Sequence, residues 1–261
     1  MSLENTRVLL TGGTGGIGNY LARVLVDAGA DLQVIGRSVP QTRGAGHMPA
    51  DLSSISDIER VAKLVAGWEP EILINLAGSQ FFGQFEDQAT SDVQRSYILN
   101  LVAPTILAQA VIPAMKERGS GQIVNVGSIF GSINYPHFVT YSVAKAGLRA
   151  LTQSLRRELK GSGIQLTYVA PRAVDSGLNR GGVAKFVELT KMAADPADVV
   201  AQRIFRAIRK KERDVYIGAP ERFFVWMNAM SPGVVDLGLA QQTRDVRNLL
   251  NSGINGESDH V

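Results

Sequence analysis

The sequence contains no cysteine and only three histidines. Without cysteine the chain cannot form a disulfide, a thiolate zinc site, an iron–sulfur cluster or a cysteine nucleophile, which suits a reducing compartment. The histidines, His47, His137 and His260, are scattered and show no metal-ligand spacing, which disfavours a histidine zinc site or a Ser-His-Asp triad. We therefore expect no metal centre, and any catalysis must use other side chains.

A strong charge excess is also missing, because 27 basic side chains stand against 24 acidic ones. A net charge of +3 gives no reason to expect nucleic acid as a partner. The segment Met1–Leu10 lacks the hydrophobic region of a signal peptide. The uncharged segment Ser96–Met115 contains Asn100, Pro104 and Pro113, which favour a buried helix over a membrane span. These absences predict a cytoplasmic protein.

What is present is a composition close to the globular average, with 45% hydrophobic and 20% charged residues. This composition excludes disorder, collagen-like repeats and a coiled coil as descriptions of the whole chain. A length of 261 residues suits one domain. We predict that domain over residues 1–250, with an apolar extension from about residue 220, and a flexible polar tail over residues 251–261.

Short apolar segments with many β-branched residues alternate with longer segments whose apolar residues recur at helical spacing. This alternation predicts right-handed β-α-β crossovers and a parallel sheet covered by helices on both faces. The predicted strands are Arg7–Leu10, Leu32–Ile35, Ile72–Asn75, Ile123–Val126, Gln165–Val169 and Asp214–Ile217. The predicted fold is therefore α/β, a single doubly wound Rossmann-type domain with a parallel sheet of roughly six to seven strands.

A glycine-rich turn, Thr11–Gly18, directly follows the first predicted strand and precedes a helix. Glycines let the backbone turn tightly and approach a pyrophosphate, which binds to the unpaired N–H groups at the positive end of a helix. The order of strand, turn and helix favours a dinucleotide site over a purely structural turn. The residues expected to contact the cofactor here are Gly12, Thr14, Gly15, Gly16, Ile17 and Gly18.

The end of the second predicted strand indicates which dinucleotide binds. A carboxylate at this position would accept the ribose hydroxyls of NAD(H), whereas a basic side chain pairs with the 2′-phosphate of NADP(H). The sequence has no acid here, and Arg37 and Ser38 follow the strand. This pattern favours NADP(H) as the cofactor. The alternative is that Arg37 is an ordinary solvated arginine.

Polar residues also lie where the predicted sheet would bind a ligand. Tyr141 and Lys145 are one helical turn apart and project from one face, although such a pair alone is more often an ordinary surface pair. Ser128 follows a predicted strand at the carboxyl edge of the sheet, where doubly wound folds bind ligands. Asn100 lies inside an apolar helix, where a polar side chain needs a reason. Their joint presence makes catalysis the better interpretation.

Taken together, these motifs resemble those of the short-chain dehydrogenase/reductase family, over about Arg7–Ile217. The turn Thr11–Gly18 is similar to the family's Thr-Gly-x-x-x-Gly-x-Gly turn. The family's Asn, Ser and Tyr-x-x-x-Lys set is matched in order and spacing by Asn100, Ser128, Tyr141 and Lys145. The resemblance implies an NADPH-dependent oxidoreductase that reduces a ketone to a secondary alcohol and forms homodimers or homotetramers.

Transfer of a hydride to a carbonyl leaves negative charge on its oxygen, which must gain a proton as the charge develops. A tyrosine with an ordinary pKa of about 10 is a reluctant partner near neutrality. We expect the ammonium of Lys145, together with the positive nicotinamide ring that forms on oxidation, to lower the pKa of Tyr141 toward the working range, so that Tyr141 serves as the proton donor. The resemblance further implies that Lys145 holds the nicotinamide ribose, that Ser128 bonds the substrate oxygen and that Asn100 positions a water.

Further cofactor contacts are implied by the resemblance alone. They are Asp51 and Leu52 beside adenine, Asn75, Ala77 and Gly78 after a strand, and Pro171, Val174 and Ser176 near the nicotinamide. Without the resemblance, Asp51 is only a helix N-cap and Asn75–Gly78 only a strand-ending turn.

Arg172 and Ser176 depart from the family pattern, which has Pro-Gly and then Thr in this region. Ser176 keeps a hydroxyl, but Arg172 replaces a flexible residue by a bulky cation. Arg172 either attracts an anionic substrate or carrier, or forms a surface ion pair. The altered turn leaves open an alternative function, a non-catalytic NADP(H)-binding sensor or scaffold.

The substrate end contains two apolar segments. Gly177–Met192 corresponds to the substrate lid of this fold. Phe223–Met230 either packs over the core, lines a hydrophobic substrate pocket, or makes peripheral contact with a membrane near basic residues. This extension resembles that of reductases acting on 3-oxoacyl, acyl-thioester or lipid-like ketones, and small or steroid-like ketones are the alternative.

Overall fold

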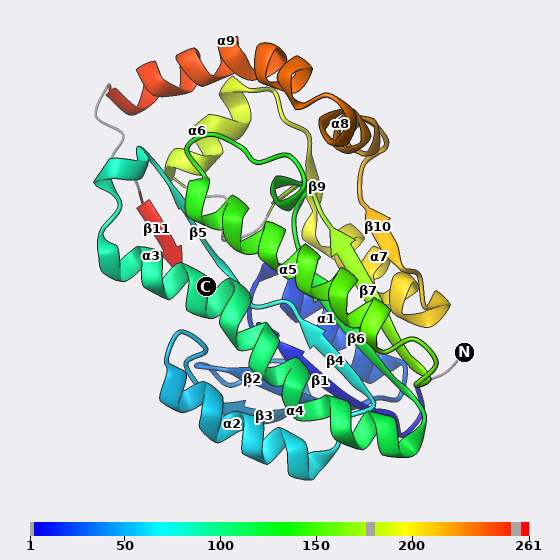
Figure 1. Cartoon of the computed structure of the whole chain (residues 1–261). Helices are drawn as coiled ribbons and strands as arrows, with labels where there is room; N and C mark the ends of the chain where they lie inside the picture. Colours follow the sequence, from blue (N-terminus) through cyan, green and yellow to red (C-terminus); the bar gives the residue numbers. More distant parts are fainter. Residues whose placement is uncertain (1–2, 176–180, 252–256, 261) are drawn as a thin grey trace.

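Residues 3–175, 181–251 and 257–260 are described by the structure, which is a computed structural model (Figure 1). At its centre lies a seven-stranded sheet in the order β10-β7-β6-β4-β1-β2-β3. Its strands are β1 (Arg7–Thr11), β2 (Asp31–Gly36), β3 (Gly46–Pro49), β4 (Ile72–Asn75), β6 (Gly121–Val126), β7 (Ile164–Ala170) and β10 (Asp214–Tyr216). Neighbouring strands of this sheet are parallel, which confirms the predicted doubly wound α/β fold.

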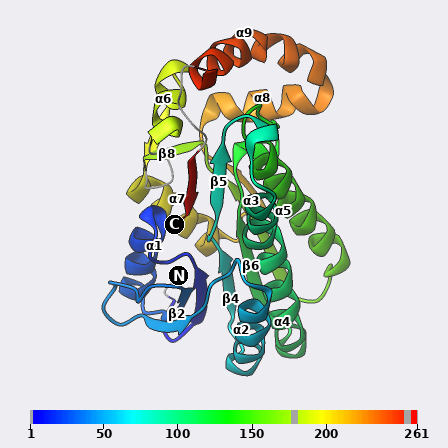
Figure 2. The same ribbon diagram turned by 90° about the vertical axis from the view of Figure 1, so that its left-hand side faces the viewer.

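The inner strands are continuous apolar segments because helices cover both of their faces. In β1 the side chains of Val8 and Leu10 enter one core, and that of Leu9 enters the other. The covering helices are α1 (Gly16–Asp27) and α7 (Ala197–Lys210) on one face, and α2 (Ile55–Trp68), α4 (Ala103–Arg118) and α5 (Val139–Glu158) on the other (Figure 2).

The helical run Thr90–Arg118 is long and apolar enough to cross a membrane by length and composition alone. It consists of α3 (Thr90–Tyr97), the π-helical turn η2 (Ile98–Val102) and α4. The α4 side chains Leu107, Val111 and Met115 are buried in the core that α4 shares with α2 and the sheet. This run therefore packs as a core helix of the domain, as the prolines and Asn100 predict.

Three helices lie over the carboxyl ends of the strands, and we call them the cap (Figure 1). They are α6 (Gly181–Leu189), α8 (Ala219–Met230) and α9 (Pro232–Asn251). Helix α8 starts where the sequence predicts an apolar extension, and Val225 of α8 packs with Val235 of α9 and Ile133. A separate pair of parallel strands, β8 (Ala173–Asp175) and β9 (Ala194–Pro196), connects the sheet to this cap.

The C-terminal segment differs from the expectation. The polar composition of residues 251–261 predicts a flexible tail, whereas Glu257–His260 form β11, which pairs antiparallel with β5 (Ser79–Phe82). The reason is that β5 lies outside the main sheet, so its backbone N–H and C=O groups are open to a second strand. Backbone pairing of this kind needs no apolar side chains, and composition therefore gives no sign of it.

A chain of buried amides and hydroxyls connects the sheet to α5. Asn75 Nδ2 donates to Asn125 Oδ1, and Asn125 Nδ2 donates to Thr152 Oγ1, both at 2.8 Å. Thr152 Oγ1 in turn donates to the carbonyl oxygen of Leu148. These bonds join β4 and β6 to α5, the helix that carries Tyr141.

Replacing Thr152 by valine should destabilise the fold, because Asn125 Nδ2 would keep no acceptor in the core. We expect Thr152→Val to lower the free energy of unfolding by about 1–3 kcal/mol, measured by urea denaturation. Thr152→Ser keeps the hydroxyl and serves as the control, so it should lose less. Equal stability of Thr152→Val and the natural protein would contradict a stabilising role of this network.

Candidate active site

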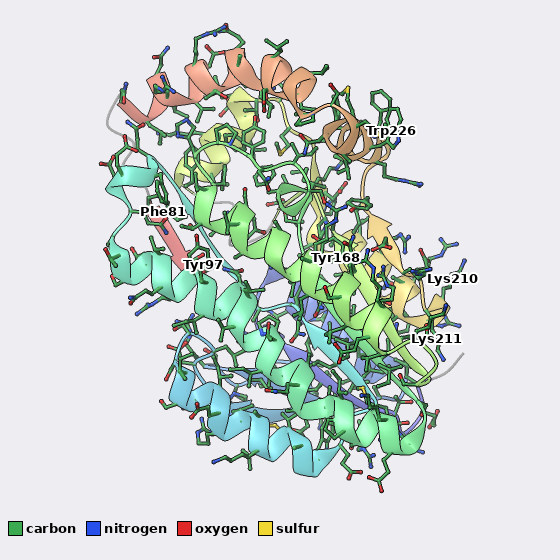
Figure 3. The ribbon with its side chains drawn as sticks, viewed as in Figure 1. Phe81, Tyr97, Tyr168, Lys210, Lys211 and Trp226 are labelled. Atoms are coloured by element: carbon green, nitrogen blue, oxygen red, sulfur yellow. The ribbon has the colours of Figure 1, made fainter. Side chains whose placement is uncertain are left out.

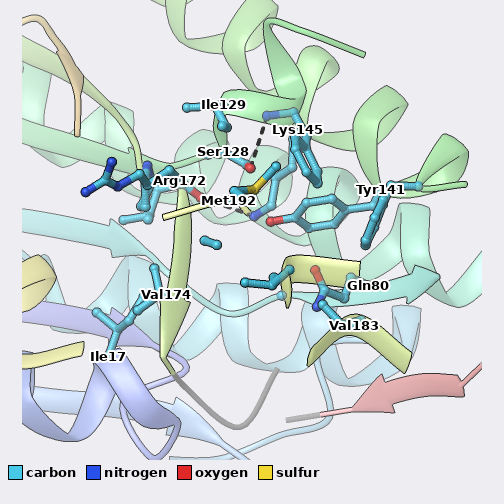
Figure 4. Close-up of a pocket in the computed structure, with 18 of the residues that line it drawn as sticks. Ile17, Gln80, Ser128, Ile129, Tyr141, Lys145, Arg172, Val174, Val183 and Met192 are labelled. Atoms are coloured by element: carbon cyan, nitrogen blue, oxygen red, sulfur yellow. Dashed lines mark hydrogen bonds between the residues drawn. The ribbon is translucent and has the colours of Figure 1, made fainter. Parts of the chain in front are cut away.

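Ser128, Tyr141 and Lys145 line one pocket at the carboxyl end of β6 (Figure 4). Ser128 follows β6 and is the N-cap of the short helical turn η3 (Ile129–Gly131). Its Oγ accepts a hydrogen bond from the backbone N–H of Phe130. Tyr141 and Lys145 lie one turn apart on α5, as predicted from their spacing. The sheet edge and α5 therefore bring together three of the predicted catalytic side chains.

Two contacts fix the positions of these groups. Lys145 Nζ donates to the carbonyl oxygen of Val126 at 3.1 Å, where β6 ends. The hydroxyl of Tyr168, a fully buried residue of β7, donates to the carbonyl oxygen of Ser128 at 3.3 Å. The contact of Tyr168 with Ser128 is not predicted from the sequence, because it forms only where β7 lies next to β6.

Burial dominates the ionisation of the Tyr141 phenol. It raises the pKa of Tyr141 to about 12, although a hydrogen bond with Ser128 acts in the opposite direction. In the protein alone, burial therefore keeps the pKa of Tyr141 above the working range, and the lowering predicted for Lys145 together with a bound nicotinamide stays a prediction. Burial also lowers the pKa of Lys145 to about 8, and its Nζ lies 5.7 Å from the centroid of the Tyr141 ring. At neutral pH Tyr141 is thus protonated, the form that a proton donor needs.

Asn100 occupies the π-helical turn η2 and is fully buried. Its Nδ2 donates to the carbonyl oxygens of Ser79 and Ser96, both at 2.9 Å, while its Oδ1 has no hydrogen-bond partner among the described residues. A Cβ on Gly78 would lie 2.7 Å from Asn100 Oδ1 and 3.3 Å from Lys145 Nζ. The oxygen and the amine therefore border the same small space, which the glycine leaves open.

The glycine turn has the geometry of an anion cradle. Gly12 has a φ of +71°, and a Cβ there would lie 2.8 Å from the backbone of Ala77. A Cβ on Gly18 would collide with the carbonyl oxygen of Gly12, so α1 starts directly beneath the turn. Gly15 precedes α1 without a side-chain cap, which leaves the first N–H groups of the helix for a ligand. These features fit the pyrophosphate of a dinucleotide.

A groove beside the glycine turn gathers eight of the predicted cofactor residues. Those that line it are Gly12, Thr14, Gly15, Arg37, Ser38, Asp51, Leu52 and Ala77. Ile17, Gly78, Pro171 and Val174 line the catalytic pocket instead. Asn75 borders neither space, because its amide is bound to Asn125 between two strands. Ser176 lies outside the described residues.

Two arginines among the described residues line this groove, and only Arg37 is predicted from the sequence. Arg37 follows β2, and Arg95 comes from α3. Burial alone would raise the pKa of Asp51, but hydrogen bonds from Ser53 and the charges of Arg37 and Arg95 hold it below its usual value. Arg95 and Leu99 both line the groove and are one helical turn apart. This helical spacing is the sequence signal by which Arg95 could have been predicted.

Arg172 is held in an ion-pair cluster. Its guanidinium donates to both oxygens of Asp195, at 2.7 and 2.9 Å, and to Glu221 at 3.2 Å. All three side chains are largely buried. Arg172 therefore forms an ion pair, as one of the two interpretations predicts, but in a largely buried cluster rather than on the surface. The cluster fastens the turn after β7 to β9 and to α8 of the cap.

Residues 6–185 match the family model described as short chain dehydrogenase. The chain belongs to the short-chain dehydrogenase family. Among its relatives, dehydrogenase/reductase SDR family member 7B of Mus musculus is 30% identical over 270 residues, which cover 94% of this chain and 83% of that protein. Ketoacyl reductase HetN of Nostoc sp. is 32% identical over 232 residues, which cover 83% of this chain and 79% of that protein.

Solved structures agree with this family. A short-chain dehydrogenase from Sphingobium yanoikuyae in complex with NADPH superposes with a TM-score of 0.75 at 27% identity, over 88% of this chain and 95% of that one. The protein is therefore an NAD(P)-dependent short-chain dehydrogenase. Its catalytic pocket and the groove beside the glycine turn both lie where strands of the sheet end, at β6 and β2.

The buried amine of this short-chain dehydrogenase should give its stability a distinct pH dependence. The pKa of Lys145 falls from 10.5 in the unfolded chain to about 8, so the unfolded state binds more protons between these pH values. Stability should therefore rise with pH across this window relative to Lys145→Met, which has no amine to titrate. Urea denaturation at neutral pH and at about pH 10 should show a relative gain on the order of 2 kcal/mol. A difference that does not change with pH would contradict the lowered pKa.

Proposed function

We propose that the protein is an NADPH-dependent reductase that converts ketones to secondary alcohols, with Tyr141 as the proton donor. The observation that carries this proposal is the convergence of Ser128, Tyr141 and Lys145 on one pocket beside the glycine turn. The rest of that pocket is mostly apolar, and its larger side chains are Phe130, Phe138, Val183, Phe186, Val187 and Met192. A polar end in an apolar pocket suits a carbonyl compound.

The protein's own side chains supply the proton to the substrate oxygen. When bound, the nicotinamide supplies the hydride that reduces the carbonyl carbon. Ser128 donates a hydrogen bond to the carbonyl oxygen and stabilises the negative charge that develops there. Tyr141, which burial keeps protonated at neutral pH, transfers its phenolic proton to that oxygen.

Lys145 assists the loss of that proton. Its pKa of about 8 leaves most of the amine charged at neutral pH, close to the Tyr141 ring. A positive charge in this place stabilises the phenolate that forms. Asn100 Oδ1 and Lys145 Nζ border the space beside Gly78, where a water would bridge them and relay a proton.

The preference for NADP(H) rests on the charges at the adenosine end. Arg37 and Arg95 both face the groove, and Ser38 adds a hydroxyl donor for phosphate oxygens. No acid follows β2, where NAD(H)-binding sheets place a ribose-binding carboxylate. The Sphingobium yanoikuyae relative, whose structure contains NADPH, supports the same choice.

The alternative function, a non-catalytic NADP(H)-binding sensor or scaffold, rests on the unusual Arg172. Arg172 lines the catalytic pocket, but its guanidinium is bound by Asp195 and Glu221. The altered turn therefore gives no reason to expect inactivity. The ketoacyl reductase HetN relative favours a 3-oxoacyl or lipid-like ketone over a small one.

Three further expectations stay predictions. They are the cytoplasmic location, the assembly into homodimers or homotetramers, and peripheral membrane contact through the exposed rings of α8, Phe223, Phe224 and Trp226.

Tyr141→Phe should abolish ketone reduction while leaving cofactor binding intact, because only the acidic hydroxyl is lost. We expect kcat/KM for NADPH-dependent reduction to fall by about 10²–10⁴-fold in a steady-state assay. Fluorescence titration with NADPH should give an unchanged Kd, which controls for folding. Activity equal to the natural protein would rule out Tyr141 as the donor, and NADPH binding without turnover by the natural protein on a broad ketone panel would support the sensor function.

Arg37→Asp should reverse the cofactor preference, because it replaces a phosphate partner by a ribose-binding carboxylate. A charge-assisted contact of about 1.5–3 kcal/mol corresponds to a loss of roughly 10–100-fold in kcat/KM for NADPH. The activity with NADH should hold or rise. Arg23→Asp makes the same charge change on the exposed face of α1, outside the groove, and should leave the NADPH to NADH ratio unchanged. An unaltered ratio in Arg37→Asp would show that Arg37 is a solvated arginine.

A further inference from the structure

The cap borders a second cavity, open to solvent on one side, next to the catalytic pocket. It lies between η3 and the helices α8 and α9. Its larger apolar walls are Ile133, Phe224, Met227, Val234, Val235 and Leu239. Nothing in the proposed proton transfer uses this space, since its lining includes none of Asn100, Ser128, Tyr141 and Lys145.

The chemistry of the cavity wall points to an uncharged hydrocarbon. Among the described residues, no lysine or arginine lines it, and the one acidic residue that does, Glu221, is paired with Arg172. Glu221 Oε2, which has no hydrogen-bond partner in the described part of the chain, lies against Gly218, which is outside the lining. The Tyr135 hydroxyl donates to Gln242 Oε1 at 2.6 Å, and the Thr190 hydroxyl donates to the carbonyl oxygen of Phe186. A space with these walls and without a cation suits an apolar chain better than a carboxylate or phosphate.

The cavity is adjacent to the catalytic pocket through a shared wall. Ile129, Phe130 and Met192 line both spaces. Ile129 and Phe130 directly follow Ser128, the residue proposed to hold the carbonyl oxygen. Figure 4 shows Met192 beside Ser128, and its unbranched side chain can change rotamer to open the partition. A chain attached to a carbonyl at Ser128 would therefore meet the cavity within a few carbon atoms.

The faces of α8 differ in their contacts. Phe224 and Met227 line the cavity, although Phe224 is also 47% exposed, whereas Phe223 does not line it and is 56% exposed. Trp226, which is 60% exposed, points outward (Figure 3). The apolar extension thus has an inner face that shapes a binding space, in addition to its outer rings.

We propose that this cavity binds the alkyl chain of a long-chain ketone whose carbonyl lies at Ser128 and Tyr141. The inference rests on the proposed function and deepens it, because it names the substrate class. Each methylene buried in the cavity should raise kcat/KM by about fourfold until the space is filled. A homologous series of straight-chain methyl ketones, from pentanone to undecanone, measures this effect with NADPH.

Two glycines of α9 provide a matched pair of variants. Gly238 lines the cavity, Gly233 does not, and a Cβ at either position meets nothing within 4 Å. Gly238→Phe should obstruct the cavity without straining the helix, while Gly233→Phe adds the same ring elsewhere on α9. Val235→Phe is a second obstructing variant, since Val235 is a buried part of the wall. Thermal unfolding of each variant shows whether it is folded.

The proposal expects both obstructing variants to reduce undecanone at least about tenfold less efficiently than the natural protein, with pentanone reduced equally well. Gly233→Phe should keep the natural chain-length profile. The proposal is overturned if the natural protein shows no preference for the longer chain, or if both folded obstructing variants retain it. In those cases ketone reduction itself still stands.

A binding measurement separates this proposal from the proposed function. Isothermal titration of Tyr141→Phe with undecanone and pentanone needs no turnover, so it applies even if no ketone is reduced. Tighter binding of undecanone, lost when Gly238→Phe is added, supports the cavity while the reductase assignment fails on its own assay. Equal binding of the two ketones overturns the cavity proposal whatever the activity.

Discussion

The burial of a cation at the end of β6 organises the active site. Lys145 is 3% exposed, and its amine is held by the carbonyl oxygen of Val126. That bond places the amine at the sheet edge, and the helical spacing then carries Tyr141 over the same pocket. The lowered pKa of Lys145 shows that its charged form is less stable in the folded protein than in the unfolded chain. The packing of α5 must offset this cost in the free energy of folding.

The pocket in front of this cation is polar at one end and apolar at the other, and different parts of the fold build the two ends. The polar end comes from the sheet edge and α5, and the apolar end comes from η3 and the cap. Arg172 connects the two parts through Asp195 and Glu221. Arg172, which departs from the family pattern, is thus paired with carboxylates in β9 and α8. These ion pairs connect the cap to the edge of the sheet that carries Ser128.

Local patterns predict the parts of the site whose residues are close together in sequence. The turn Thr11–Gly18 needs only a strand before it and a helix after it, and the pair Tyr141 and Lys145 needs only a helix. Strand β3 has a weaker pattern, since Gly46–Pro49 contains a glycine and a proline at the edge of the sheet, and it is missing from the predicted strands. Asn75 matches a family motif, but the register of β4 on β6 turns its amide toward Asn125.

The sequence alone predicts the fold class from periodicity, and the candidate catalytic residues from spacing and a family resemblance, because these patterns are properties of the chain itself. The tertiary structure decides the rest. It sets the raised pKa of Tyr141, brings Arg95 to Arg37, pairs Arg172 with two acids, joins β11 to β5 and leaves a cavity under the cap. Burial, charge pairing and cavities exist only where segments distant in the chain pack together, and so no local pattern records them.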